Sequence, residues 1–464
     1  MGEVFDSSLE AYDWRYSAAI VGLYRYLNRF ELPFNKDEIM SRTELDCLRY
    51  NRADITEERY LQFAEEFYDE EFQHKKAERM LARDSFEEDT IKEINALLTA
   101  NTILKKFFSK EKFDGTNKER ILQIINENRA EIVRETFRNK TNMYRNYCNT
   151  NLLFSEGQTV CRVNGYYVDW GKKGKSASYG FDTNRFLGRD ILEFDFIPFA
   201  FTENMEGYFI NYSTSILDLV HSNNMLKKAL ERAKSDAKDA GRKISIKQVL
   251  FEELIYASDY FNFDVELIMK QRNHDYFETL FLRKASISIF KSMKTWSSKR
   301  VFQQSFKVTE DYYRFALQEV MDAIINLTAL DDLIQYVLKQ QEKAPNYGAL
   351  LTSLISINTK IYRTLYGGEK MNKKAIKECA RKIALNVEEN KLSAYRTKLT
   401  SSLVFRDYNR VCEILLQLSN YAKVSLDCML NVFEDCEKNK NSVYLFVACL
   451  RKAQIEDVNE GGEQ

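Results

Sequence analysis

A single Gly-rich, aromatic and basic stretch interrupts a chain that otherwise has the periodicity of long amphipathic helices. This stretch covers residues 146–212. Prolines occur only at Pro33, Pro198 and Pro345, and so few helix breakers favour long uninterrupted helices. The pattern predicts a mostly α-helical fold with a small β insert, in which a hairpin-rich region interrupts the helical N-terminal part.

The interruption divides the chain into predicted regions. They are an N-terminal helical region at residues 1–145, a β-hairpin and loop insert at 146–214, a basic helical region at 215–305 and an antiparallel helical bundle at 306–464. Helical periodicity after the insert predicts helices over 215–240, 246–270, 275–300, 310–343, 347–366, 371–390, 392–422, 424–438 and 441–455. The later helices have the short links expected of a bundle.

Two helix starts are expected in the N-terminal region. Apolar residues recur at helical spacing from Trp14 onward, and this helix must end before Pro33. A second helix is predicted to begin with Asp54 as its N-cap, because Glu57 follows three residues later as in a capping box.

The insert contains a strong hairpin signal. Asn164 and Gly165 separate two β-rich runs, and a type I′ turn needs positive φ at both central positions. Residues 192–202 alternate between aromatic and polar side chains and predict a second strand, with 208–212 as its partner. Pro198 within that run suggests an edge strand or a bulge.

Charge is unevenly distributed along a chain whose net charge is −1. Residues 57–71 contain seven acids and one cation, whereas residues 281–307 contain no acid. The cations of the second segment are Arg283, Lys284, Lys291, Lys294, Lys299, Arg300 and Lys307. On a helix, Lys284, Ser288 and Lys291 share a face, and cations interleaved with hydroxyls suit phosphate oxygens. The alternative is an ordinary solvated helix face.

A second basic element follows the hairpin, where Lys172, Lys173 and Lys175 lie between glycines. Glycines let backbone N–H groups approach a phosphate, and lysines neutralise it. The spacing does not match a P-loop, so nucleotide hydrolysis is not indicated. The alternative is a mobile solubilising loop.

The residues that commonly ligate metals give no convincing site. Cys148 and Cys161 each stand alone, whereas a structural zinc site needs four ligands. The Glu-x-x-His spacing ending at His74 is echoed only by Asp218 and His221, so we expect a surface histidine rather than a di-iron helix. We therefore expect no enzyme, cofactor or metal, and the alternative is a metal-dependent enzyme using Glu70, Glu71 and His74.

No apolar run is long enough for a membrane span, and the N-terminus lacks a signal-peptide pattern. The cysteines lie mostly in apolar helical contexts, as expected of reduced core thiols. These features predict a cytoplasmic protein without membrane contact.

Three segments resemble the large subunit of type I CRISPR surveillance complexes (Cascade), particularly the I-A and I-B branches. They are DWRYSAAIVGLYRYL at residues 13–27, the insert marked by Cys148 and Cys161, and GRDILEFDFIPFAFT at 188–202. Many relatives carry two CxxC pairs in the insert, and this chain departs from that pattern. The resemblance implies a subunit without catalytic residues that contacts the protospacer-adjacent motif, stabilises the R-loop and presents target DNA to a helicase-nuclease. The bundle is similar to a Cascade small subunit.

The resemblance also implies partners, namely target double-stranded DNA, the crRNA-containing Cascade backbone, its small subunits and a helicase-nuclease. The candidate motif-sensing residues are Arg162, Asn164, Tyr166, Tyr167, Lys172, Lys173 and Lys175. The candidate DNA path is Lys284, Lys291, Lys294, Lys299 and Arg300, which Lys373, Lys374, Lys377 and Arg381 could continue. The alternative function is a helical protein-interaction scaffold that uses the acidic N-terminal face and the bundle, without nucleic acid.

Overall fold

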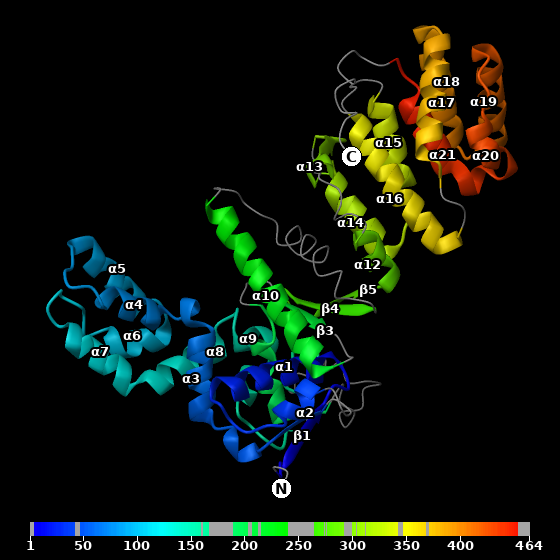
Figure 1. Cartoon of the computed structure of the whole chain (residues 1–464). Helices are drawn as coiled ribbons and strands as arrows, with labels where there is room; N and C mark the ends of the chain where they lie inside the picture. The colour runs from blue at the N-terminus through cyan, green and yellow to red at the C-terminus, as the bar shows by residue number, and fades with distance from the viewer. Residues whose placement is uncertain are drawn as a thin grey trace, which may run out of the picture. The chain divides into compact units, whose positions relative to one another are not determined.

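Figure 1 shows the computed structural model of the chain, which is organised as two compact units. The structure describes residues 4–41, 47–158, 161–166, 189–202, 207–211, 215–239, 264–272, 274, 276–291, 299–302, 304–310, 312–341, 347–367 and 371–452. The first unit comprises Met1–Glu253 and Val265–Phe281, and the second comprises Leu254–Asp264 and Leu282–Gln464. The fold is mostly α-helical with small β-sheets, which confirms the predicted fold class.

Helix α1 (Trp14–Arg29) and the 3₁₀-helix η5 (Leu192–Phe199) pack together at the centre of the first unit. The α1 helix begins at Asp13, whose carboxylate accepts a hydrogen bond from the Arg15 N–H, and it ends before Pro33 as predicted. A Cβ at Gly22 would lie 2.0 Å from the Phe196 carbonyl oxygen. Only glycine therefore lets the two helices approach this closely.

The strand predicted over residues 192–202 is wrong, because Leu192–Phe199 forms η5. Every residue of η5 is buried, so its backbone lies among side chains and not beside a second strand. The hydroxyl of Tyr60 donates to the Asp195 carbonyl at 2.6 Å, and that of Tyr68 donates to the Pro198 carbonyl at 2.8 Å. Side-chain donors thus satisfy backbone oxygens that a β-sheet would otherwise satisfy.

Short elements surround this centre. Strands β1 (Ser7–Glu10) and β2 (Cys47–Tyr50) pair antiparallel, with Leu9 opposite Leu48. The remaining elements are α2 (Lys36–Ser41), η1 (Arg52–Asp54), α3 (Glu57–Phe67), η2 (Asp69–Glu71), α4 (Gln73–Leu81), α5 (Glu88–Leu98), α6 (Thr102–Phe108), α7 (Lys118–Glu127), α8 (Arg129–Asn139), α9 (Tyr144–Tyr147) and η3 (Thr150–Leu152). Thr56, not the predicted Asp54, caps α3, because Asp54 closes the preceding 3₁₀ turn.

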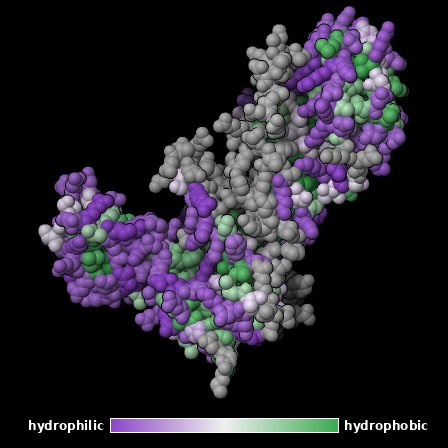
Figure 2. Space-filling view, viewed as in Figure 1, coloured by the Kyte–Doolittle hydropathy of each residue, from purple (hydrophilic) through white to green (hydrophobic). Residues whose placement is uncertain are grey.

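Helices α4 to α8 enclose a small core of their own. Buried side chains from each helix form it, including Leu81, Leu98, Leu104, Ile125 and Ile132. Helices α4 to α7 lie side by side at the left of Figure 1, and hydrophilic residues cover most of their visible surface in Figure 2. The amphipathic periodicity of this region is therefore a packing signal.

A three-stranded sheet with the order β3-β4-β5 completes the described part of the first unit, together with α10 (Ile216–Asp239). Its strands are β3 (Gly207–Asn211), β4 (Val265–Lys270) and β5 (Glu278–Leu282). The helices predicted over 246–270 and 275–300 are wrong where these strands occur. Pairing between Tyr208 and Met269 joins segments far apart in sequence, which local periodicity does not detect.

The described part of the second unit is a helical bundle that also contains a small antiparallel strand pair. Strands β6 (Ser305–Lys307) and β7 (Tyr313–Phe315) pair antiparallel. The helices are α12 (Lys284–Lys291), α13 (Lys299–Phe302), α14 (Ala316–Asn326), α15 (Asp331–Gln341), α16 (Gly348–Tyr366), α17 (Lys373–Asn386), α18 (Glu389–Val404), α19 (Tyr408–Ala422), η7 (Asp427–Met429), α20 (Leu430–Glu434) and α21 (Cys436–Cys449). The single helix predicted over 310–343 is wrong, because it is divided at Leu327, which has φ +52°. Likewise, Arg406 at φ +57° separates α18 from α19 within the helix predicted over 392–422.

In the part of the chain that the structure describes, none of the helices combines the length and apolar character needed to cross a membrane.

Candidate nucleic-acid interface

Arg162, a predicted DNA contact, is instead a buried structural residue. Its guanidinium forms ion pairs with Asp190 at 2.9 Å and with Asp195 at 2.7 Å, and the side chain is 0% exposed. The two carboxylates more than offset the effect of burial, so the pKa of Arg162 is raised and its charge is retained. The prediction that Arg162 contacts DNA is corrected here, because its charge is enclosed by protein and neutralised there.

The Asn164-Gly165 turn is present but differs from the predicted type I′ turn. Gly165 has φ +79°, whereas Asn164 is not among the described residues with positive φ, so the pattern is that of a type II turn. The Tyr166 N–H donates to the Val163 carbonyl at 3.0 Å and closes the turn. The second strand of the predicted hairpin lies outside the described residues.

Asn164 also supports the fold rather than a surface. Its side-chain amide donates to the Asn146 carbonyl at 2.9 Å and to the Arg145 carbonyl at 3.2 Å, and the residue is 6% exposed. These bonds fix the turn against the end of α9. The prediction that Asn164 lies at an exposed hairpin tip is therefore wrong, because the residue is buried.

Tyr166 is half-buried beside the start of α1. Its hydroxyl accepts a hydrogen bond from Trp14 Nε1 at 3.1 Å, and the guanidinium of Arg15 lies 4.3 Å from the ring centroid. Arg15 is itself paired with Asp13. Among the described residues of the predicted motif-sensing element, Tyr166 is therefore partly exposed to solvent. Four further members lie outside the described residues, namely Tyr167, Lys172, Lys173 and Lys175.

The basic stripe lies partly on α12. Ile287, Ile289 and Phe290 are buried against the bundle, whereas Lys284 and Ser288 are exposed and Lys291 is half-buried. Neither Lys284 nor Lys291 forms an ion pair with a carboxylate of the described residues. Asp264 accepts a hydrogen bond from the Lys284 backbone N–H at 2.7 Å and so places one negative charge at the start of α12.

The rest of the predicted path is less complete. Lys294 lies outside the described residues. Lys299 and Arg300 belong to α13, and their side chains are also outside what the structure describes. The predicted stripe is therefore represented by Lys284 and Lys291, seven residues apart on one helix face.

The acidic segment 57–71, which the scaffold alternative uses, is largely paired within the first unit. Glu57 pairs with Arg134, Glu66 with Arg29, and Glu71 with Lys140. Asp69 and Glu70 both pair with Arg79. The segment is acidic in sequence, but its partners come from α1, α4, α8 and the residue that follows α8, so it is largely compensated within the first unit.

His74, which the sequence predicts at the surface, is 1% exposed. Its Nε2 lies 2.8 Å from Glu65 Oε1, and Arg129 binds the same carboxylate oxygen at 2.5 Å. The prediction is wrong because the pattern of one helix does not reveal that Glu65 of α3, itself paired with Arg129 of α8, binds the His74 ring. Among the described residues, no group of three or more histidine, cysteine, aspartate or glutamate side chains is arranged to hold a metal ion.

Comparison with known proteins gives one informative match. A family model described as CRISPR-associated protein Csx8 matches residues 5–450. The chain belongs to this family. No curated protein sequence and no solved structure matches it.

Membership in the Csx8 family supports the CRISPR association that the sequence resemblance predicts. The match covers both compact units, including α12 and the turn at Asn164 and Gly165. The finer assignment to a I-A or I-B Cascade large subunit stays a prediction.

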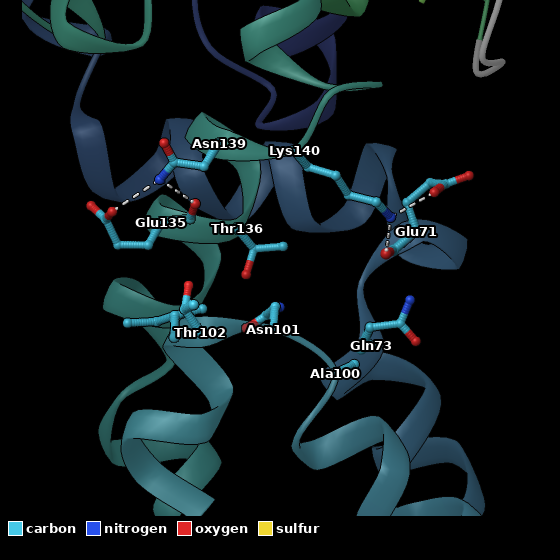
Figure 3. A pocket seen from close by; sticks show the side chains of 10 residues that line it. Glu71, Gln73, Ala100, Asn101, Thr102, Glu135, Thr136, Asn139 and Lys140 are labelled. Carbon is cyan, nitrogen blue, oxygen red and sulfur yellow. Dashed lines mark hydrogen bonds and ion pairs between the residues drawn. The ribbon is translucent and has the colours of Figure 1, made fainter.

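The first unit of this Csx8-family chain also contains a polar pocket of about 490 Å³ beside Lys140 (Figure 3). Lys140 donates to both the carbonyl and the carboxylate of Glu71, each at 2.7 Å. Across the pocket, the Asn139 amide donates to Glu135, and the buried Thr136 hydroxyl has no hydrogen-bond partner among the described residues. Two carboxylates line this pocket, so its charge does not suit a polyanion.

Proposed function

We propose that this chain is a DNA-binding subunit, without catalytic residues, of an RNA-guided CRISPR surveillance complex. Family membership supports the CRISPR association. The observation that carries the DNA-binding part is the pair of lysines on α12, whose ammonium groups have no carboxylate partner among the described residues while the opposite helix face is buried. In such complexes guide pairing reads sequence, and protein reads a short duplex motif and the phosphate backbone.

The spacing of the two lysines suits a nucleic-acid backbone. Seven residues of α-helix separate Lys284 from Lys291, which corresponds to roughly 10 Å along the axis. Phosphates of one strand repeat about every 3.4 Å along a duplex, so the lysines match phosphates about three nucleotides apart. Contacts of this kind position the protein on DNA without reading sequence.

Within this proposal the chain acts as the large subunit of a Cascade-type complex. It contacts the protospacer-adjacent motif, stabilises the R-loop and presents target DNA to a helicase-nuclease. Tyr166 and the loop residues Tyr167, Lys172, Lys173 and Lys175 are assigned to motif sensing, and α12 is assigned to the duplex or the displaced strand. The corrected residues Arg162 and Asn164 support the described segment that precedes these residues in the sequence.

The test is target-DNA binding by the assembled complex with Lys284→Gln and Lys291→Gln combined. Loss of two phosphate contacts should weaken binding and reduce the slope of log affinity against log salt by about 1.8 for duplex DNA. The control combines Lys391→Gln and Lys398→Gln, which removes two lysines at the same spacing on α18. Equal affinity and salt slope in the two double variants would contradict the proposal, and complex formation unaffected by competitor DNA would favour the scaffold alternative.

A further inference from the structure

The second unit brings cysteines from different helices together in pairs. The structure describes all eight cysteines of the chain, and each is a free thiol. Cys379 of α17 lies within hydrogen-bonding reach of Cys428 in η7. Cys412 of α19 lies within the same reach of Cys436 at the start of α21. Neither pair belongs to the proposed DNA interface, so the chemistry of these thiols is independent of the proposed function.

Local packing holds the turn that carries Cys428 against α17. Cys379 Sγ donates to the Ser425 carbonyl at 3.5 Å, three residues before Cys428. Leu426 and Met429 lie on either side of Cys428 and are buried, and the Met429 N–H donates to the Leu426 carbonyl at 2.8 Å. The backbone on both sides of Cys428 is therefore fixed, so the two thiols stay adjacent in the folded bundle.

The two thiols of this pair differ in exposure and in acidity. Cys379 is 8% exposed, whereas Cys428 is half-buried. The hydrogen bond from the Cys379 thiol lowers the pKa of Cys428 to about 7, although burial and the charge of Asp427 oppose this. The same hydrogen bond, together with burial, raises the pKa of Cys379. Because the thiolate is the nucleophile, Cys428 is the reactive member of the pair.

The second pair provides a comparison within the same bundle. Cys412 Sγ donates to the Val432 carbonyl at 3.8 Å, and Cys436 is 7% exposed. Burial raises the pKa of Cys412. Burial and the neighbouring Cys412 raise the pKa of Cys436 to about 12. Both thiols are therefore largely protonated near neutral pH, so this pair has the proximity but little thiolate.

We propose that Cys379 and Cys428 form a reversible oxidation site for hydroperoxides. The Cys428 thiolate attacks one peroxide oxygen, the O–O bond breaks, and the other oxygen takes a proton and leaves as an alcohol or water. Cys379 then attacks the sulfur of the resulting Cys428 sulfenic acid, and the S–O bond breaks with loss of water. In total the two thiols lose two protons and two electrons, and the hydroperoxide gains them.

The first experiment uses the full chain, purified with reductant that is then removed. Hydrogen peroxide is added, the remaining thiols are blocked with N-ethylmaleimide, and unreduced peptides are read by mass spectrometry. We expect a peptide that links Cys379 to Cys428 and is lost on treatment with dithiothreitol. Cys428 that stays alkylated, or that becomes a sulfinic acid without a link, overturns the proposal.

A mixture of ¹⁵N-labelled and unlabelled chains tests whether the link forms within one molecule. Linked peptides should carry either two labelled or two unlabelled halves. Linked peptides with one half of each kind at the statistical frequency would show a cross-link between molecules and overturn the proposal.

The rates at the two pairs test the assignment of Cys428 as the attacking residue. At pH 7 a thiol with a pKa of about 7 is about half ionised, whereas one with a pKa above 9 is less than about 1% ionised. The lower intrinsic nucleophilicity of the more acidic thiol offsets part of this advantage. Cys428 should therefore be lost about fivefold or more faster than Cys412, and equal rates would contradict the assignment.

Single variants separate the attacking residue from the resolving one. Cys379→Ser leaves the Cys428 sulfenic acid without its partner thiol, so dimedone should label Cys428. Cys428→Ser should leave Cys379 unlabelled under the same conditions. Cys412→Ser is the matched control and should retain the link between Cys379 and Cys428. Thermal melts check that the variants fold, and dimedone labelling of Cys379 in place of Cys428 would contradict the assigned roles.

Discussion

Arg162 Nη1 lies 2.7 Å from Asp195 Oδ1, and both side chains are completely buried. The Asp195 carboxylate also accepts hydrogen bonds from the Tyr144 hydroxyl at 2.6 Å and from the Phe154 N–H at 2.9 Å. The pair joins the segment before the Asn164-Gly165 turn to η5. A cation that the sequence places in a basic loop is thus part of the core.

Replacing Arg162 with Met should destabilise the first unit strongly. The substitution leaves Asp190 and Asp195 buried without their cation, and removing one partner of a buried ion pair costs about 3–5 kcal/mol. Arg29→Met is the control, because its bridge to Glu66 is largely exposed and such pairs contribute about 1 kcal/mol or less. Urea unfolding measures the loss of unfolding free energy in each variant. Similar losses in the two variants would show that burial of the Arg162 ion pair is unimportant.

Gly22→Ala should destabilise the chain although alanine is the better helix former. The added methyl group would collide with the Phe196 backbone, and overpacking of this kind costs about 1–3 kcal/mol. Gly348→Ala is the matched change at the start of α16, where the nearest atom belongs to the flexible Arg451 side chain. That variant should be neutral or slightly stabilised, so opposite shifts in melting temperature are expected.

Glu65 should make stability depend on acid pH. Burial alone would raise its pKa, but the hydrogen bond with His74 and the charge of Arg129 lower the pKa below the ordinary value of 4.5. A lowered folded-state pKa stabilises the protein above that ordinary value, and the stabilisation is lost as the pH falls through the folded-state pKa.

Glu65→Gln should therefore be less stable than the parent at neutral pH, and the difference should shrink as the pH falls below 4.5. Denaturant unfolding over this pH range measures it. Glu58→Gln, an exposed change on the same helix, is the control. A stability difference for Glu65→Gln that is independent of pH would contradict the assigned role of its charge.

Replacing Lys172, Lys173 and Lys175 together by Ala should weaken target-DNA binding while leaving complex assembly intact. These residues follow the turn at Asn164 and Gly165, and neutralised phosphates release counterions whose number sets the salt dependence. Filter binding at several salt concentrations measures the change, and co-purification with the other subunits checks assembly. Unchanged affinity and slope would count against the loop as a DNA contact.

The sequence predicts elements well where one segment carries the whole signal. Apolar periodicity predicts the α1, α10 and α16 helices. The observed bounds of α16, Gly348–Tyr366, agree closely with the predicted range 347–366, because no proline interrupts the pattern there. The β4 strand was missed because Val265–Lys270 is apolar enough to suit a buried helix or a strand. Its antiparallel pairing with Gly207–Asn211, distant in sequence, decides between them.

The candidate site was harder to predict because charge in sequence does not reveal charge at the surface. Arg162 and Lys284 both belong to basic segments, yet one is enclosed by two aspartates and the other is exposed. The partners of Arg162 follow it by about thirty residues: Asp190 precedes the segment predicted as a strand, and Asp195 lies within it. Likewise, the cations that neutralise residues 57–71 belong to other helices.

The late position of η5 in the chain has a consequence for synthesis. The rings of Phe196 and Phe199 pack against those of Tyr60, Phe63 and Phe137. During synthesis, these aromatic rings of the earlier helices therefore lack their packing partners until residue 199 has emerged from the ribosome. A nascent or truncated polypeptide that stops before Leu192 exposes this apolar surface to water. Exposed apolar surface of this kind favours chaperone binding or self-association.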